Sequence, residues 1–97
     1  LMPAASRLTD MSTGHGCFPP TPVNGGVASK TSIEGLMAAI VGSTHPAHAC
    51  GNTVHAGRTI SSGSGKTTIE GSPAARIGDS ISCGDVMGQG ATKTFIG

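Results

Sequence analysis

One short phrase occurs three times in this 97-residue chain, and the repetition limits what the chain can fold into. The copies read KTSIEG, KTTIEG and KTFIG, and a second phrase built around an alanine pair accompanies them. Units this short cannot bury an apolar face alone, so each needs its neighbours. We therefore predict three similar units around a pseudo-threefold axis, a shape that suits the axis of a trimer. The first phrase spans residues 30–35, 66–71 and 93–97, and the second spans 3–10, 37–43 and 73–79.

The composition indicates a thin apolar core closed by many turns. Hydrophobic residues make up 36% of the chain, but only two are Phe and none is Trp or Tyr. Small domains of this kind often need a staple beyond their core. Sixteen Gly and six Pro favour tight turns, and a charged fraction of only 11% argues against disorder. The net charge of +1 gives no electrostatic basis for binding nucleic acid or an anionic membrane.

Short runs rich in Ile, Thr and Val alternate with Gly-rich segments, which predicts an all-β fold in a single domain over residues 1–97. The apolar run 36–40 is the one helical candidate, and the repeats favour a strand there. Residues 18–22 (FPPTP) are expected to form an ordered extended loop, because prolines supply no amide donors. We expect strands at residues 30–33, 39–41, 59–61, 67–69, 76–77 and 92–96.

The amino terminus has no basic segment followed by an apolar stretch, and no apolar run has the length of a membrane span. Leu1 precedes a Met that is typical of a natural start, so we expect Leu1 to be an expression remnant. The chain is expected to be made in a cytoplasm and then exported or packaged by other proteins.

The polar chemistry lies in the histidines and cysteines. Zinc needs four nitrogen or sulfur ligands in a tetrahedron, and a closed set of four forms a structural site. The phrase His48-Ala-Cys50, with His55 five residues further on, is compatible with such a site. The alternative is that the histidines are scattered on the surface and the cysteines are small core residues. The full set is His15, Cys17, His45, His48, Cys50, His55 and Cys83.

Two enzyme-like patterns fail on closer reading. Residues 63–68 (GSGKTT) resemble the end of a phosphate-binding loop, but Ile60 stands where that pattern needs Gly, and a strand phrase follows instead of a helix. Cys–His pairs, which are typical of some hydrolases, are equally typical of a metal site. We therefore predict that the chain is not an enzyme and has no small-molecule substrate.

In its alanine-pair phrase and in the segments that hold its histidines and cysteines, the chain resembles the PAAR-repeat proteins, which form the tips of the spikes of contractile injection machines. The resemblance implies a small conical three-repeat β domain whose broad base docks on the blunt end of a trimeric β-helix, one tip per trimer. It also implies one structural zinc near the apex, held on this chain by His15, His48, His55 and Cys83. The matching segments are residues 13–22 (TGHGCFPPTP), His48-Ala-Cys50 with His55, 73–79 (PAARIGD), Cys83-Gly84 and 95–97 (FIG), in family order.

The ligand set has close competitors. His45 and Cys50 are near enough to replace a proposed ligand, but His45 falls outside the matching His-x-Cys phrase and we leave it out. Iron is an alternative metal, because imidazole and thiolate accept both ions. With Cys83 on the metal, Cys17 and Cys50 remain. A disulfide between them is one outcome, but a protein assembled in a reducing cytoplasm seldom keeps one, so we expect buried free thiols.

The middle repeat departs from the family pattern. Ile40 and Ser43 stand where Arg and Asp are usual, which is expected to weaken the internal symmetry. At the base we expect Ile33, Ile69 and Ile96 to present a flat apolar face, which docking on the partner chains would cover.

The function that the resemblance implies is a structural cap that sharpens a membrane-piercing central spike and enters the target envelope transiently with it. The chain is expected to be a bare tip with no toxin attached. Its place would be the tail-spike tip of a phage virion or the secreted tip of a type VI secretion spike. The alternative is a free-standing zinc-binding adaptor module that recruits effectors or partner proteins. A complex of one chain with three spike chains distinguishes the cap from the adaptor.

Overall fold

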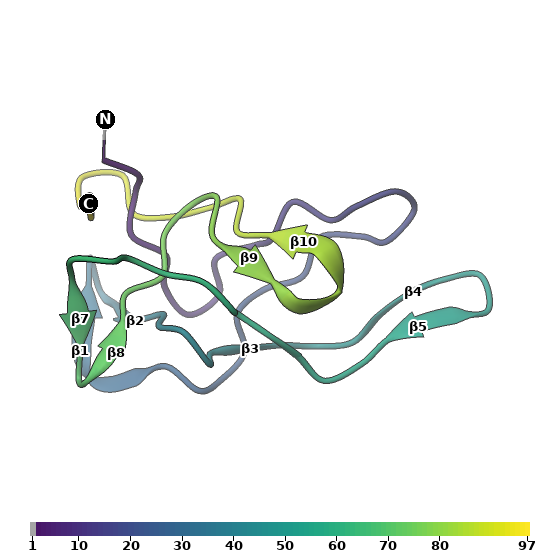
Figure 1. Cartoon of the computed structure of the whole chain (residues 1–97), viewed down its shortest axis with the longest axis horizontal. Coiled ribbons are helices and arrows are strands. Elements are labelled where there is room, and N and C mark those ends of the chain that lie inside the picture. The colour runs from purple at the N-terminus through teal and green to yellow at the C-terminus, as the bar shows by residue number, and fades with distance from the viewer. Residues whose placement is uncertain (1) are drawn as a thin grey trace.

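The described residues, 2–97, form pairs of short antiparallel strands in the computed structural model, and none of them is α-helical (Figure 1). Leu1, which we expect to be an expression remnant, lies outside the described residues. Nowhere in the described chain is there a helix with the length and apolarity needed to cross a membrane. The prediction of an all-β fold is confirmed. The pairs are β1 (Ala28–Ile33) with β2 (Leu36–Ala38), β3 (Thr44–His45) with β6 (Arg58–Thr59), β4 (His48–Cys50) with β5 (Thr53–His55), β7 (Thr68–Ile69) with β8 (Ser72–Pro73) and β9 (Ser80–Ile81) with β10 (Asp85–Val86), and the 3-10 turn η1 (Ser82–Gly84) joins the last two strands.

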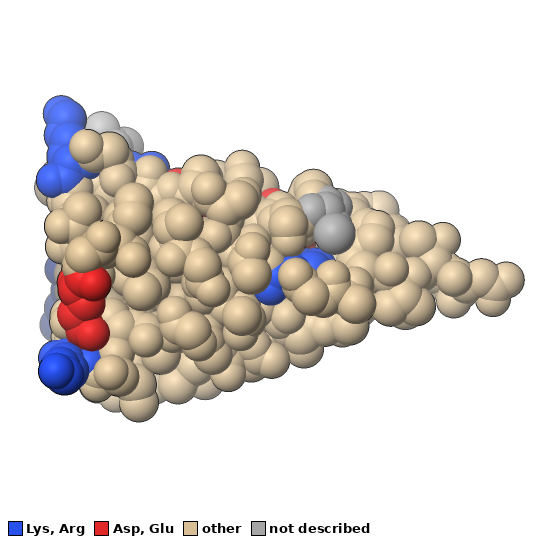
Figure 2. Space-filling view, turned by 60° about the horizontal axis from the view of Figure 1, so that its bottom comes forward, with Lys and Arg blue, Asp and Glu red and all other residues tan. Residues whose placement is uncertain are grey.

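The molecule tapers from a broad base to a narrow end (Figure 2), with principal extents of 38 × 26 × 23 Å. β1, β7 and β8 lie at the base together with the C-terminal end of the chain, whereas the β4–β5 hairpin reaches furthest towards the narrow end (Figure 1). The predicted cone is therefore confirmed.

Three backbone hydrogen bonds form a closed ring at the centre of the fold. The Ser6 N–H donates to the Ala75 carbonyl, the Ala75 N–H donates to the Ala39 carbonyl, and the Ala39 N–H donates to the Ser6 carbonyl. The N···O distance is 3.0 Å in all three. The three residues hold the same place in the repeated alanine-pair phrase, and all three are buried. A ring of three equal bonds between equivalent residues places the repeats around a pseudo-threefold axis, as predicted.

The same turn follows the ring in every repeat. The backbone N–H of Arg7 donates to the Asp10 carboxylate at 2.8 Å, and that of Arg76 donates to the Asp79 carboxylate at 2.7 Å. In the middle repeat the Ser43 hydroxyl accepts the corresponding bond at 2.9 Å. The expectation that this repeat weakens the symmetry is therefore wrong for the backbone. Only the Arg–Asp ion pair is missing from it among the described residues.

Each repeat then sends one arm towards the narrow end. We call residues 11–22 the first arm, 44–59 the second arm and 80–86 the third arm. An equivalent backbone bond closes the base of each arm. The carbonyl groups of three buried residues that follow the arms, Val23, Ile60 and Met87, accept from the N–H groups of residues 9, 42 and 78, at 3.0, 2.9 and 2.8 Å. The cone therefore has one arm from each repeat.

The apolar core consists of two small clusters stacked along the axis. The cluster nearer the arms contains Val23, Ile60 and Met87. The cluster nearer the base contains Ile33 and Ile96 among several alanines, with Ile69 packed against it. Ile33 and Ile96 are only 9% and 8% exposed, so the prediction that they form an outward apolar face is wrong. With so few large side chains in the chain, these isoleucines are needed inside.

The strands agree with the sequence only in part. Residues 36–40 contain β2, so the choice of strand over helix is confirmed. The expected strands 39–41 and 76–77 are single bridges, at Ile40 and Arg76, that lead straight into turns. The β4–β5 hairpin was not predicted.

Glutamates from two repeats fasten the base. Glu34 and Glu70 each occupy the first position of a two-residue turn, at φ 51° and 52°. The Glu70 carboxylate accepts bonds from the Lys30 backbone N–H and the Thr31 hydroxyl, at 2.9 and 2.8 Å. The Glu34 carboxylate accepts bonds from residues 92, 93 and 94. Each repeated glutamate therefore bonds to a neighbouring repeat across the base.

Candidate metal centre

The first arm ends in a tight turn that carries His15. The His15 and Phe18 backbones exchange two hydrogen bonds, at 3.1 and 2.9 Å, and Gly16 has φ 56° between them. Glycine adopts this left-handed conformation without a steric penalty. The two bonds therefore fix the backbone of His15 at the end of the first arm.

The second arm carries the other two histidines on one face. In the β4–β5 hairpin His48 lies directly opposite His55, and Cys50 lies opposite Thr53. Gly51, with φ 61°, takes the first of the two turn positions, which is typical of a type II′ hairpin. Because side chains alternate along a strand, Cys50 shares the face of His48 and His55. The sequence spacing of these three residues follows from this register.

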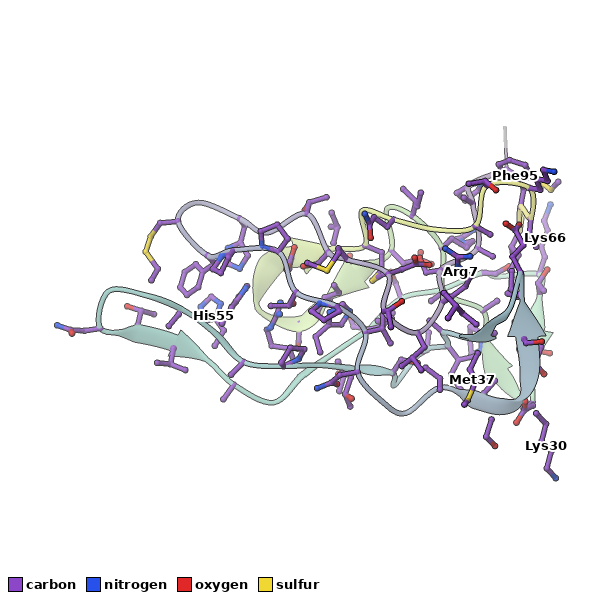
Figure 3. The ribbon with its side chains drawn as sticks, turned by 180° about the vertical axis from the view of Figure 1, so that it is seen from behind. Arg7, Lys30, Met37, His55, Lys66 and Phe95 are labelled. Carbon is purple, nitrogen blue, oxygen red and sulfur yellow. A yellow bond between two sulfur atoms is a disulfide. The ribbon has the colours of Figure 1, made fainter. Side chains whose placement is uncertain are left out.

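The fold brings His15, His48 and His55 together. One ring nitrogen from each lies within 4.8 Å of the other two. The His48 Nδ1 lies 3.0 Å from the Pro19 carbonyl, which can only accept, so the proton sits on Nδ1 and Nε2 is available as a ligand. That Nε2 lies 3.2 Å from the His55 Nδ1. The His55 side chain lies in the narrow part of the cone (Figure 3).

The spacing of His48 and His55 fits a tetrahedral metal ion. With Zn–N bonds of about 2.0–2.1 Å, two tetrahedral ligands are about 3.3 Å apart, close to the 3.2 Å between the His48 and His55 nitrogens. The His15 Nε2 is buried without a hydrogen-bond partner, a state that costs about 1–3 kcal/mol unless something binds the nitrogen. A metal ion would satisfy it. The group is therefore able to hold a metal.

The surroundings of His55 favour the form of its imidazole that binds metals. Burial lowers the pKa of His55 below its ordinary value of 6.5, and the neighbouring His15 and His48 lower it further. A positive charge on His55 beside a charged neighbour is unfavourable, so His55 favours its neutral state. Metal ions bind neutral imidazole, not imidazolium.

Phe18 packs against all three imidazoles. Its ring centroid lies 4.0 Å from that of His55, 4.7 Å from that of His48 and 4.8 Å from that of His15. The ring is stacked on the faces of His15 and His55. The sequence analysis gave Phe18 no role, although it is one of only two phenylalanines and lies three residues after a predicted ligand.

The fourth predicted ligand, Cys83, belongs to η1 in the third arm. Its backbone is described, but its side chain lies outside the described part of the structure. The assignment of Cys83 as a ligand therefore stays a prediction.

The prediction of two buried free thiols is wrong. Cys17 and Cys50 form a disulfide with a Cα–Cα distance of 5.5 Å, and Cys17 is exposed. Each cysteine lies two residues beyond a histidine of the group, Cys17 after His15 and Cys50 after His48. The β4–β5 register and the turn of the first arm bring the two sulfur atoms together. The disulfide therefore joins the two arms that carry the three histidines.

A buried polar network lies between the metal group and the apolar core. The Arg58 guanidinium and the Asp85 carboxylate pair at 2.9 Å, with both side chains fully buried. Arg58 also donates to the Pro46 carbonyl at 3.0 Å and to the Thr21 hydroxyl. The network thus joins all three arms. Nothing in the sequence analysis singled out Arg58 or Asp85, because neither belongs to a repeated phrase.

Two titratable groups of this network have shifted pKa values. Burial alone would raise the pKa of Asp85, but bonds from Ser12 and the Val86 backbone and the Arg58 charge outweigh it and lower the pKa. Burial and then the Arg58 charge lower the pKa of His45. The His45 Nδ1 lies 3.2 Å from the Thr21 carbonyl, so His45 takes part in this network and not in the group of three.

The sequence was also compared with known proteins. The family model for the PAAR motif matches residues 8–89, which is most of the chain. No curated protein matches it. The matched span includes the ring residues Ala39 and Ala75, the three clustered histidines and the whole second arm. Proteins with this motif are structural components at the spikes of contractile injection systems. The resemblance seen in the sequence is confirmed, and the chain belongs to the PAAR-motif family of spike-tip proteins.

Proposed function

We propose that this chain caps the central spike of a contractile injection machine, with its base seated on a trimeric β-helix and its narrow end meeting the target envelope. The pseudo-threefold ring of Ser6, Ala39 and Ala75 carries the proposal, because it lets one chain match the end of three. In this role the whole chain acts as one domain and a structural part, with no reaction of its own. The machine is a phage tail or a type VI secretion system.

The metal in this proposal is zinc, held by His15, His48, His55 and Cys83, with iron as the other ion that such ligands accept. Zinc bound in this way supplies a tetrahedral cross-link. The set takes one ligand from the first arm, two from the second and one from the third, so it ties all three arms. Little apolar area is available where the cone narrows, and metal bonds replace the missing burial there.

The proposal is tested by mixing the chain with a trimeric β-helix fragment of a contractile spike. Native mass spectrometry and light scattering are expected to find one chain per three β-helix chains. A matched control is a β-helix fragment shortened so that its blunt end is lost, which should not bind. A chain that stays free in solution, or that binds in any other ratio, contradicts the cap and favours the adaptor function.

A further inference from the structure

Three lysines occupy equivalent corners of the base. Lys30, Lys66 and Lys93 each lie two residues after a residue that pairs with the alanine phrase. Residue 28 pairs with 38, residue 64 bonds to 74 at 2.8 Å, and residue 91 bonds to 5 at 2.7 Å. All three lysines are exposed. The Lys30 and Lys66 side chains lie at the broad end of the molecule (Figure 3).

The lysine charges have no partner in the described part of the chain. Every arginine is paired with an aspartate there, and no lysine takes part in a salt bridge. The acidic groups of the base are directed elsewhere. Glu34 and Glu70 accept bonds from threonine hydroxyls and backbone N–H groups of neighbouring repeats. The third repeat has Gly97 in place of their glutamate.

The base is small for an interface that relies on apolar contact alone. A face bounded by 26 × 23 Å offers about 500 Å², so docking buries about 1,000 Å² in total, the low end for specific complexes. Its isoleucines face inward, and Phe95 and Met2 remain as exposed apolar side chains of the segments beside Lys93. An interface of this size gains orientation and association rate from charge complementarity.

We propose that Lys30, Lys66 and Lys93 form a three-cornered carboxylate-binding rim, and that the end of the trimeric partner presents one acidic group per chain to it. This rests on the proposed function, because one acidic group per partner chain matches three equivalent lysines. The charges stand at separate corners with two glutamates on the same face, and the chain carries only +1 overall. That distribution disfavours nucleic acid and anionic lipid as the occupant.

The test uses two trimeric β-helix fragments, one ending in an Asp on each chain and one with Asn in its place. Each of Lys30→Gln, Lys66→Gln and Lys93→Gln is expected to weaken binding to the Asp fragment two- to fivefold, and the triple variant about tenfold or more. The association rate should fall, and its dependence on salt should largely disappear. Binding to the Asn fragment should be weak for the unaltered chain and insensitive to the substitutions.

The control variant is Asn52→Asp, which changes the net charge as much as one lysine substitution but lies at the β4–β5 turn, away from the base. It should bind as the unaltered chain does. The lysine variants should also keep the melting temperature of the unaltered chain, because the lysines form no ion pair in the described part of the chain.

A reciprocal exchange completes the test. A triple Lys→Glu variant should lose the Asp fragment and bind a fragment ending in Lys. If the triple Gln variant binds the Asp fragment with unchanged affinity, the proposed carboxylate-binding rim is wrong, but the proposed cap function is not contradicted. Failure of the unaltered chain to bind either fragment overturns both. Tighter binding to vesicles containing phosphatidylserine than to the Asp fragment also overturns the rim, since the occupant would then be a lipid surface.

Discussion

Glycines of this chain that look alike in sequence have different structural roles. The segment 63–65 is a turn-like Gly-Ser-Gly in sequence, yet its two glycines differ. A Cβ added at Gly63 would lie 2.8 Å from the Ala74 carbonyl oxygen, whereas one added at Gly65 would meet nothing within 4 Å. Gly90 holds the place of Gly63 in another repeat, and a Cβ there would lie 2.7 Å from the Ala5 carbonyl oxygen. Close backbone packing, not turn geometry, requires glycine at these two positions.

This difference predicts opposite outcomes for two neighbouring substitutions. Gly63→Ala should lower the free energy of unfolding by about 1–3 kcal/mol, because backbone must move to admit the methyl group. Gly65→Ala should leave it unchanged or raise it by up to about 1 kcal/mol, because alanine restricts the unfolded chain. Urea unfolding of both variants measures the two effects. Equal losses would show that the segment acts only as a flexible turn.

His45 predicts how stability depends on pH. Its pKa is lowered in the folded state from 6.5, first by burial and then by the Arg58 charge. Below pH 6.5 the unfolded chain therefore binds more protons than the folded chain, and stability falls as the pH drops from 6.5 through the lowered pKa. In His45→Gln this part of the loss should disappear. Unfolding free energies of metal-free protein between pH 8 and 5 test it, and parallel curves for the two proteins would contradict it.

At the scale of elements, the repeated phrases predicted the symmetry but not the arms. The turn after each alanine pair recurs whether its acceptor is Asp10 or Ser43, because both side chains reach the same N–H. The β4–β5 hairpin was missed because His48 and His55 were interpreted as metal ligands and not as parts of strands. Its strands are also too short and polar for an alternating pattern. The Arg58–Asp85 pair was missed because two residues 27 apart in sequence meet only once the arms converge.

The disulfide between the first and second arms has a measurable effect. A Cys17→Ser/Cys50→Ser variant should unfold with about 2–4 kcal/mol less free energy than the oxidised chain, because the cross-link restricts the unfolded state. Reductant should lower the melting temperature of the unaltered chain and leave that of the variant unchanged. Competition with a chromogenic chelator should also show weaker zinc binding by the variant, since its histidine arms are less constrained. Identical melting of the oxidised chain and the variant would contradict this expectation.

At the scale of the whole molecule, the cone depends on different forces along its length. Apolar clusters and backbone bonds hold the base and the ring, buried ions hold the middle, and a disulfide and a metal-binding group hold the narrow end. From the scarcity of large side chains the sequence predicted a thin core that needs a staple, but it predicted neither the buried ion pair nor the disulfide. It did not predict that Ile33 and Ile96 are buried in the core, so that charged side chains are exposed at the base in their place.

Metal removal should therefore act locally before it acts globally. Purified protein is expected to hold one zinc per chain by elemental analysis, and binding should contribute on the order of 10 kcal/mol. His15→Ala, His48→Ala and Cys83→Ser should each lose the ion, while His45→Gln keeps it. In hydrogen exchange, a strong chelator should expose amides of the arms while Ser6, Ala39 and Ala75 stay protected. If the ring and the arms lost protection together, the expectation that metal removal opens the arms alone would be contradicted.

The closure of the ring has a consequence for how the chain reaches this state. The Ala5 N–H bonds to the Thr94 carbonyl and the Ile96 N–H bonds to the Pro3 carbonyl, so the first and last residues of the ring segments meet. Long-range pairings of this kind delay folding, because a large loop must close before any contact rewards it. A ribosome-bound chain cannot complete its first repeat until its last one has emerged. The bonds that join residues 3–5 to residues 94–96 therefore form only after residue 96 has been synthesised, and until then the first repeat lacks these partners.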